Sequence, residues 1–505
     1  MEKKYIFDFS NYKYGNDDVV ATLTTLSNGY ISIRGDFEFT KSIFGTVISG
    51  IYSYVPIFYR ELVNLPRIIS LNLTLDGELL TLNSILGPVE RILNVYEGTL
   101  RHRFAWKTNN GIINYESIRL VHKKIKPLFV MRICLRSINA SGKLCVMSPI
   151  DLNMFNHLLP KNIFVKLFKI TNAFKEDLKN FVSVETDDHK YTVHFGLLNK
   201  VSSKWKRYSY IDMDSIGDIL CVDVNPGDEY VIEKYAVIDQ SIGRVHEILN
   251  ELAFSQFEKI FTNHKDAWSK EWYELGVKLD GDEDFERSLI FNTFHLLQLY
   301  NDEAEDFMLP ARGLHGYGYH GHIFWDADIY SLPFYLFIKP EAAKKMLKFR
   351  CRTLNAAKIN AKMHGFKGAQ YPWESTDDGL EATPKEVPLD LLGMSKVTIE
   401  TGDLEHHITA DIAYATDLYY RVTEDDEFMK ECGLKIIFET ARFWTSRVEF
   451  DESKNAYVIN NVIGPDEYHV HVNNNFYTNI MARYNLELGI KYYEESLRKK
   501  SGQKL

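Results

Sequence analysis

The segment LKIIFETARFW at residues 434–444 repeats apolar side chains at the spacing of an α-helix. The stripe consists of Leu434, Ile437, Phe438, Ala441 and Trp444. Side chains three and four positions apart share one face of a helix, so the stripe predicts a helix with one buried face. Similar segments run near residues 284–300, 325–338, 340–364, 404–421 and 475–499. The chain is therefore predicted to be helical from about residue 245 onward.

Long loops rich in Gly, Pro, Trp, His and acidic residues separate these helices. They cover residues 309–324, 365–403 and 451–474. Loops of this length inside a compact domain are usually functional. The alternation of helix and long loop predicts a helical barrel whose loops build a site at one end.

The N-terminal part of the chain has a different pattern, in which short alternating runs are separated by turn signals. Asp76-Gly77, Asn110-Gly111 and the run from Asn225 to Asp228 are the clearest of these signals. Many short strands at close spacing predict a β-sandwich. We therefore expect a sandwich domain over residues 1–245, a helical linker over 246–283 and a partial helical barrel over 284–505.

Composition limits the possible partners and the compartment. The formal net charge is -10, which gives no general attraction for nucleic acid or for an anionic membrane. The N-terminus lacks the apolar run of a secretory signal, and no stretch approaches the length of a membrane span, so we expect a cytoplasmic protein. The cysteines are odd in number and lack metal-ligand or redox spacing, which predicts reduced thiols. They are Cys134, Cys145, Cys221, Cys351 and Cys432.

The loop NNVIGPDEYHVHVNNN at residues 460–475 holds the best candidate for a catalytic acid. A rigid Gly-Pro turn is followed at once by Asp466 and Glu467, with Tyr468 and His469 beside them. A carboxyl group among aromatic rings loses hydration, which raises its pKa and suits it to donate a proton. Glycosidic bond cleavage needs such a donor. In isolation, the same composition is typical of a solvated turn.

Two further loops combine tryptophans with carboxylates, as sugar-binding pockets do. Trp373 and Glu374 lie in GFKGAQYPWESTDDGLEATP at residues 365–384. Trp325 and Asp326 open a helix, where the helix dipole favours an ionised carboxylate. Each pair alone is also compatible with a buried tryptophan beside a surface acid. A metal site is not favoured by His315, His320 and His322, because His320 and His322 do not share one helical face, and the same holds for His469 and His471. His406-His407 at a helix start favours a capping or core role.

Five segments, taken together and in this order, resemble glycoside hydrolase family 65, which includes maltose, trehalose and kojibiose phosphorylases and acid trehalases. They are SNGYISIRGDFE (27–38), ARGL…GYGYHGHIFWDAD (311–328), GAQYPWES (368–375), EHHITADIAYA (405–415) and VIGPDEYHVHVNNNFYTNIMA (462–482). The resemblance extends over nearly the whole chain, and the last two segments are highly specific.

The resemblance implies an antiparallel β-sandwich of the galactose mutarotase-like type, a helical linker and an (α/α)6 barrel. It assigns Glu467 as the general acid of an inverting cleavage. It assigns Trp325, Asp326, Trp373 and Glu374 to the subsite of the non-reducing glucose. It implies no metal and no cofactor, with inorganic phosphate as co-substrate if the enzyme is a phosphorylase.

Several positions depart from the family pattern. His315 stands where a small hydroxyl residue is usual, and Tyr317 and His320 replace an acidic and a basic residue. Asp328 and Val470 each replace a glutamate. These positions flank the expected pocket, so they bear on substrate identity more than on chemistry.

Only about half of the barrel is expected in this chain, because the pattern predicts roughly six helices where an (α/α)6 barrel has twelve. The family's later segment, with a Lys-Gln pair that binds glucose and loops that bind phosphate, has no counterpart in this sequence. The expected fold is thus a multi-domain β + α protein with a partial barrel. A homodimer, or a second polypeptide that completes the barrel, is the expected partner besides the disaccharide.

Three functions follow from these observations. Phosphorolysis of an α-glucosidic disaccharide to β-glucose 1-phosphate and glucose is favoured because phosphorylases are frequent in the family that the chain resembles. Phosphate needs no protein base, so Glu467 alone would suffice for this reaction. An inverting, trehalase-like hydrolase is the first alternative, and it requires a second carboxylate about 6.5–9.5 Å from the acid. An inactive or split-gene fragment that only binds carbohydrate is the second.

Overall fold

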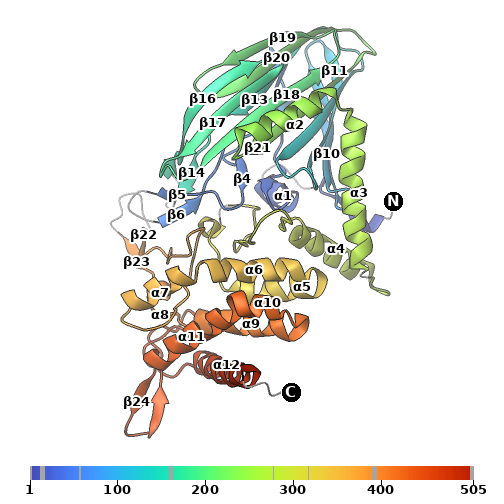
Figure 1. The fold of residues 1–505 in the computed structure, drawn as a ribbon. Coiled ribbons are helices and arrows are strands. Elements are labelled where there is room, and N and C mark those ends of the chain that lie inside the picture. Colours follow the sequence, from blue (N-terminus) through green and yellow to red (C-terminus); the bar gives the residue numbers. More distant parts are fainter. Residues whose placement is uncertain are drawn as a thin grey trace.

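The computed structural model places a β-sandwich above a stack of α-helices (Figure 1). It describes residues 3–11, 17–55, 59–158, 163–276, 278–316, 318–388 and 395–500. The strands of the sandwich end near residue 239, and from residue 242 the chain is mainly helical with two short hairpins in its loops. The predicted order of a sandwich followed by helices is confirmed.

The larger sheet of the sandwich has nine strands, and neighbouring strands pair antiparallel. In spatial order they are β1 (Ile6–Asp8), β9 (Ile85–Asn94), β10 (Thr99–Thr108), β11 (Gly111–Val121), β12 (Leu128–Ser137), β21 (Glu229–Asp239), β18 (Thr192–Val201), β17 (Lys179–Thr186) and β16 (Phe168–Glu176). Burial alternates along strands such as β10 and β11, because successive side chains point to opposite faces.

The smaller sheet has five strands and packs its apolar face against the larger one. Its order is β19 (Lys206–Ile211), β20 (Ser215–Val224), β13 (Gly142–Asp151), β7 (Asn72–Leu75) and β8 (Glu78–Leu79). The predicted hairpins are confirmed. Asp76 and Gly77 take positive φ between β7 and β8, and the Asn110-Gly111 turn joins β10 to β11.

Two helices connect the sandwich to the helical part of the chain. Helix α2 (Ile242–Phe254) lies across the outer face of the larger sheet, where Val245 and Leu249 are buried. Gly196 of β18 allows this contact, because a Cβ there would lie 2.5 Å from Leu249 Cδ1. Helix α3 (Phe257–Leu275) then runs down the side of the sandwich towards the helical stack (Figure 1).

The helical part follows the predicted segments closely. Its longer helices are α4 (Glu283–Leu297), α5 (Leu332–Ile338), α6 (Pro340–Arg352), α7 (Leu354–Met363), α9 (Ile408–Thr423), α11 (Leu434–Arg447) and α12 (Phe476–Lys500). The predicted helix over 340–364 is broken at Thr353, which caps both α6 and α7. Short turns α8 (Thr401–Leu404) and α10 (Asp426–Phe428) precede α9 and α11. In the described part of the chain, the loops between these helices carry the candidate site.

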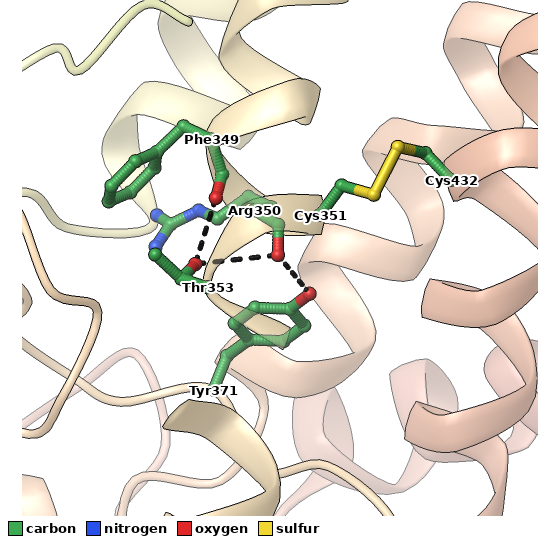
Figure 2. The surroundings of a disulfide bond; sticks show 6 residues. All are labelled: Phe349, Arg350, Cys351, Thr353, Tyr371 and Cys432. Carbon is green, nitrogen blue, oxygen red and sulfur yellow. Dashed lines mark hydrogen bonds between the residues drawn. A yellow bond between two sulfur atoms is a disulfide. The ribbon is translucent and has the colours of Figure 1, made fainter. Parts of the chain in front are cut away.

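The prediction of reduced cysteines is wrong for four of the five. Cys145 pairs with Cys221, and Cys351 pairs with Cys432. Cys145 and Cys221 oppose each other in the register of β13 and β20. Figure 2 shows the second bridge, which joins α6 to the turn before α11. Each pair spans more than 70 residues of sequence, so strand register and helix packing bring the thiols together where spacing gave no sign.

The helical part leaves large apolar side chains exposed. On α12, Phe476, Ile480, Ile490 and Tyr493 are each about half exposed or more. Apolar side chains gathered on one helix in this way mark a face that another element or molecule can cover. Among the described residues, no helix combines the length and apolar character needed to span a bilayer.

Candidate functional site

Two of the three long loops, 309–324 and 365–403, meet around a small aromatic core at one end of the helices. Phe324, Trp325, Tyr371 and Trp373 belong to one buried cluster that also includes Ile408 of α9. The rings of Phe324 and Trp373 meet edge to face at 5.5 Å. The structure therefore brings the two predicted tryptophans into one buried aromatic cluster.

A short β-bridge aligns the first two loops with each other. The backbone N–H groups of Ile323 and Ser375 donate to each other's carbonyl oxygens at 2.8 and 3.0 Å. Trp325 lies two residues after Ile323, and Glu374 lies one residue before Ser375, so the bridge fixes the backbone next to both residues. The positions of the two predicted Trp-acid pairs are thus coupled through the backbone.

Glu374 is buried and held by a histidine. The Nδ1 atom of His322 lies 2.6 Å from Oε2 of Glu374, and its Nε2 atom lies 2.5 Å from the carbonyl oxygen of Arg60. Arg60 belongs to β6 (Tyr59–Leu62), which pairs with β5 (Tyr52–Val55) next to the sandwich. The sandwich therefore positions a carboxylate of the candidate sugar site.

Trp373 is fixed through its backbone by a second carboxylate. Glu381 Oε2 accepts a hydrogen bond from the N–H of Trp373 at 2.9 Å, and its Oε1 accepts from the N–H of Glu374 at 3.3 Å. Thr383 donates its hydroxyl to the same carboxyl at 2.6 Å. No sequence signal pointed to this role, because Glu381 is one of several acids in the same loop, including Asp377 and Asp378.

Asp326 lies directly before a helical turn, as predicted, and its side chain is exposed. Loss of hydration raises its pKa, a backbone hydrogen bond lowers it, and the negative charge of Asp328 raises it further. The net shift of the pKa of Asp326 is upward, whereas the helix start alone was expected to favour the ionised carboxylate. Asp328 itself forms a buried ion pair with Arg350, whose Nη2 lies 2.6 Å from Oδ2.

Glu467 sits at the tip of a loop that is closed by mutual hydrogen bonds between Val462 and Val472 at 3.0 and 2.8 Å. Gly464 permits this tight turn, because a Cβ there would lie 2.3 Å from the side chain of Asn475. The aromatic neighbours do not enclose the acid as expected, since Tyr468 is 98% exposed. The prediction that aromatic rings remove water from Glu467 is therefore wrong.

The pKa of Glu467 is nevertheless raised. Glu467 is an exposed residue, but neighbouring groups still remove part of the hydration of its carboxyl, and this is the largest cause of the raised pKa. The negative charges of Glu374 and Asp326 add to the shift, while His407 opposes it. A raised pKa keeps a carboxyl protonated nearer to neutral pH. The candidate acid and two candidate sugar ligands thus act on one another electrostatically, although they come from three different loops.

The flanking positions occupy several environments. His315 contacts His295 of α4 at 2.9 Å, on the side of the sandwich. His320 stacks on Tyr59 with ring centroids 4.2 Å apart, and Tyr317 lies outside the described residues. Val470 is exposed. In the described part of the chain, no group of three His, Cys, Asp or Glu side chains could hold a metal ion.

His406 and His407 were predicted to have a capping or core role, and both are buried. His407 lies at the start of α9 between two carboxylates, with Nε2 2.9 Å from Glu405 and Nδ1 2.6 Å from Asp411. The ring of Trp325 meets its ring at 4.8 Å. The spacing of His407 and Asp411, four residues apart on a helix, was the available signal for this ion pair.

A sandwich followed by helices whose loops join tryptophans to carboxylates is the design of a carbohydrate-active enzyme. Two family models match the chain: "Glycosyl hydrolase family 65, N-terminal domain" over residues 10–271, and "Glycosyl hydrolase family 65 central catalytic domain" over residues 290–505. The chain belongs to glycosyl hydrolase family 65.

Its curated relatives include several disaccharide phosphorylases. The chain is 36% identical to the kojibiose phosphorylase of Caldanaerobacter subterraneus subsp. tengcongensis over 94% of its own length, and 32% identical to the α,α-trehalose phosphorylase of Thermoanaerobacter brockii over 92%. It spans 64% and 63% of these relatives, respectively, which is less than two thirds of their length.

Among solved structures, a protein from the human microbiome described as a candidate kojibiose phosphorylase matches with a TM-score of 0.85 at 22% identity. The match covers 99% of this chain and 68% of that one. It establishes the fold over the whole chain: a β-sandwich and part of an (α/α)6 barrel.

Proposed function

We propose that this chain supplies the glucose-binding and acid-donating part of an inverting α-glucosidic disaccharide phosphorylase. In this proposal Glu467 is the general acid, and Trp325, Asp326, Trp373 and Glu374 hold the non-reducing glucose. The products are β-glucose 1-phosphate and glucose. The proposal assigns the sandwich to residues 1–245, the helical linker to 246–283 and the partial barrel to 284–505.

One observation carries the proposal: the negative charges of Glu374 and Asp326 act on Glu467 and contribute to its raised pKa. A general acid must still hold its proton near neutral pH. Its proton must also reach the oxygen of a sugar held by the neighbouring groups. A solvated turn, the alternative for this loop, would leave Glu467 without these carboxylate neighbours.

The chemistry follows from these positions. Aromatic faces of Trp325 and Trp373 pack on the C–H faces of a glucose ring, and the carboxylates accept hydrogen bonds from its hydroxyls. Glu467 gives its proton to the glycosidic oxygen as the bond to the anomeric carbon breaks. Phosphate attacks that carbon from the opposite face, which inverts the configuration and needs no protein base.

The partner in this proposal covers the exposed apolar side chains of α12, including Phe476 and Ile490. Either a second polypeptide with the remaining barrel helices or a second copy of the chain could do so. The matched relatives are longer than the region that aligns with this chain. In this proposal, a polypeptide equivalent to their C-terminal third covers the apolar face of α12.

The first experiment incubates the purified chain with maltose, trehalose, kojibiose or nigerose, with and without inorganic phosphate. Each reaction is run on the chain alone and on its mixture with the separately expressed C-terminal third of the Caldanaerobacter kojibiose phosphorylase. Proton and phosphorus NMR identify the products. We expect β-glucose 1-phosphate only when phosphate is present.

The matched variants are Glu467→Gln and Glu452→Gln, the latter on an exposed hairpin turn away from the loop tip. Glu467→Gln should lose turnover by about 10²–10⁴-fold, the usual contribution of general acid catalysis, and Glu452→Gln should not. Free β-glucose without phosphate dependence would identify a hydrolase instead. Sugar binding with no product in any mixture would identify a carbohydrate-binding fragment.

A further inference from the structure

A buried chain of four side chains leads from α12 to the loop that carries Glu467. The hydroxyl of Tyr477 donates to Asp411 Oδ1 at 2.9 Å, and Asp411 Oδ2 lies 2.6 Å from Nδ1 of His407. The Nε2 atom of His407 lies 2.9 Å from Oε1 of Glu405. Glu405, His407 and Asp411 are all less than 3% exposed.

The second oxygen of Glu405 has no such partner. Its Oε2 atom is buried and lacks a hydrogen-bonding partner among the described residues. A buried carboxylate oxygen without a donor is costly, whereas a carboxylic acid needs less solvation. Charge balance points the same way: with Asp411 and His407 ionised, a neutral Glu405 leaves the buried group uncharged.

The Glu405 segment is fastened to the loop of the acid at two points. The N–H of Ile463 donates to the carbonyl of Leu404 at 3.1 Å, and His471 Nε2 lies 3.3 Å from Oε1 of Glu400. These bonds place the buried carboxyl behind the loop whose tip bears Glu467. The negative charge of Glu467 acts on Glu405 across this contact.

We propose that Glu405 is a positioning residue that stores one proton beside the acid, so that Glu405 stays neutral while Glu467 changes its charge. The inference rests on the proposed role of Glu467. When Glu467 gives up its proton, the site already contains the acids Asp326 and Glu374. An ionised Glu405 would add one more negative charge to the site and would repel an anionic phosphate, whereas a neutral Glu405 does not.

The other charged and titratable groups around this cluster are consistent with a stored proton. Asp328 faces Asp411 and is neutralised by Arg350. His406 faces Arg447, whose Nε lies 3.1 Å from its Nδ1. Burial raises the pKa of Glu405, the hydrogen bond and positive charge of His407 oppose this, and the negative charges of Glu467 and Asp411 raise it further, with a net result of about 7.

The test measures the proton itself and needs no turnover. The chain is labelled with ¹³C at the glutamate side-chain carboxyls, and difference infrared spectra against Glu405→Gln isolate the band of Glu405. We expect this band to titrate near neutral pH, above the ordinary glutamate value of about 4.3. A band that titrates at the ordinary value overturns the proposal.

Two variants with opposite expected effects establish the coupling. Glu467→Gln removes a negative neighbour and should lower the midpoint of Glu405 by about one unit. His407→Gln removes the cation and should raise it. Glu452→Gln, the exposed control of the hairpin turn, should leave it unchanged. An unchanged midpoint in Glu467→Gln contradicts the coupling, even if Glu467→Gln has lost turnover.

Kinetics provide an independent readout when the complemented chain is active. In the wild type, the KM for phosphate should rise above pH 7 as Glu405 ionises. In Glu405→Gln, the KM for phosphate should not rise with pH, and kcat at pH 6 should stay close to that of the wild type. If Glu467→Gln retains full turnover, the proposed function fails. The proton on Glu405 is tested separately, by the pH at which its own infrared band titrates.

Discussion

His322 links Glu374 of the helical domain to the backbone of Arg60 beside the sandwich, through contacts of 2.6 and 2.5 Å from its two ring nitrogens. The side chain of Arg60 in turn pairs with Asp377, at 3.2 Å, and with Asp188 of the sandwich, at 2.9 Å. The sandwich is therefore part of the structure that orients a candidate sugar ligand.

Replacement of His322 by alanine should weaken sugar binding, because Glu374 loses the group that fixes its carboxyl. We expect roughly a tenfold weaker glucose affinity, the effect of one lost hydrogen bond to a charged group. Titration calorimetry with glucose measures it. The matched control is His189→Ala, an exposed histidine of the sandwich. Equal affinity in both variants would mean that Glu374 does not need this support.

Replacement of Arg350 by methionine should destabilise the helical domain, since it leaves Asp328 as a buried carboxylate without a partner. Breaking a buried pair in this way costs about 3–5 kcal/mol. Urea denaturation followed by tryptophan fluorescence gives the change. A double variant that also carries Asp328→Leu should recover part of the loss, and no recovery would contradict the ion-pair explanation.

The bridge between Cys351 and Cys432 should stabilise the helical domain by limiting the unfolded chain. The two cysteines are 81 residues apart, and closing a loop of that length is worth about 4 kcal/mol in the chain-entropy account. Figure 2 places the bridge beside Arg350. Replacing both cysteines by serine should lower the urea midpoint, whereas Cys134→Ser, which removes the free thiol, should not. Equal midpoints would mean that the thiols are not bridged in solution.

His407 should make stability depend on pH in the alkaline range. Burial lowers its pKa, but hydrogen bonds to Asp411 and Glu405 outweigh this and raise the pKa to about 9. The folded state thus binds a proton more tightly than the unfolded state, whose histidine titrates near 6.5. The resulting stabilisation is complete below about pH 6.5 and is lost as the pH rises through about 9.

Urea midpoints at several pH values between 6 and 9.5 check this dependence. Wild type should lose stability across the interval, and His407→Gln should lose less. Parallel curves for the two proteins would show that His407 is not the titrating group.

The sequence by itself determined the order of the domains, the hairpins and most helix limits, because these depend on local periodicity and turn chemistry. The stripe from Leu434 to Trp444 is a helix for this reason, and Asp76-Gly77 is a turn. Motif resemblance also singled out Trp325 and Trp373, which the structure brings into one buried aromatic cluster, and Glu374, which directly follows Trp373.

Only the tertiary structure decided the partners of these residues. Cys351 meets Cys432, and His322 meets Glu374, across 81 and 52 residues of sequence. The exposure of Tyr468 and the raised pKa of Asp326 likewise depend on which groups pack nearby. Burial, hydrogen bonding and charge coupling are properties of groups that are close in space, and local sequence does not encode that proximity.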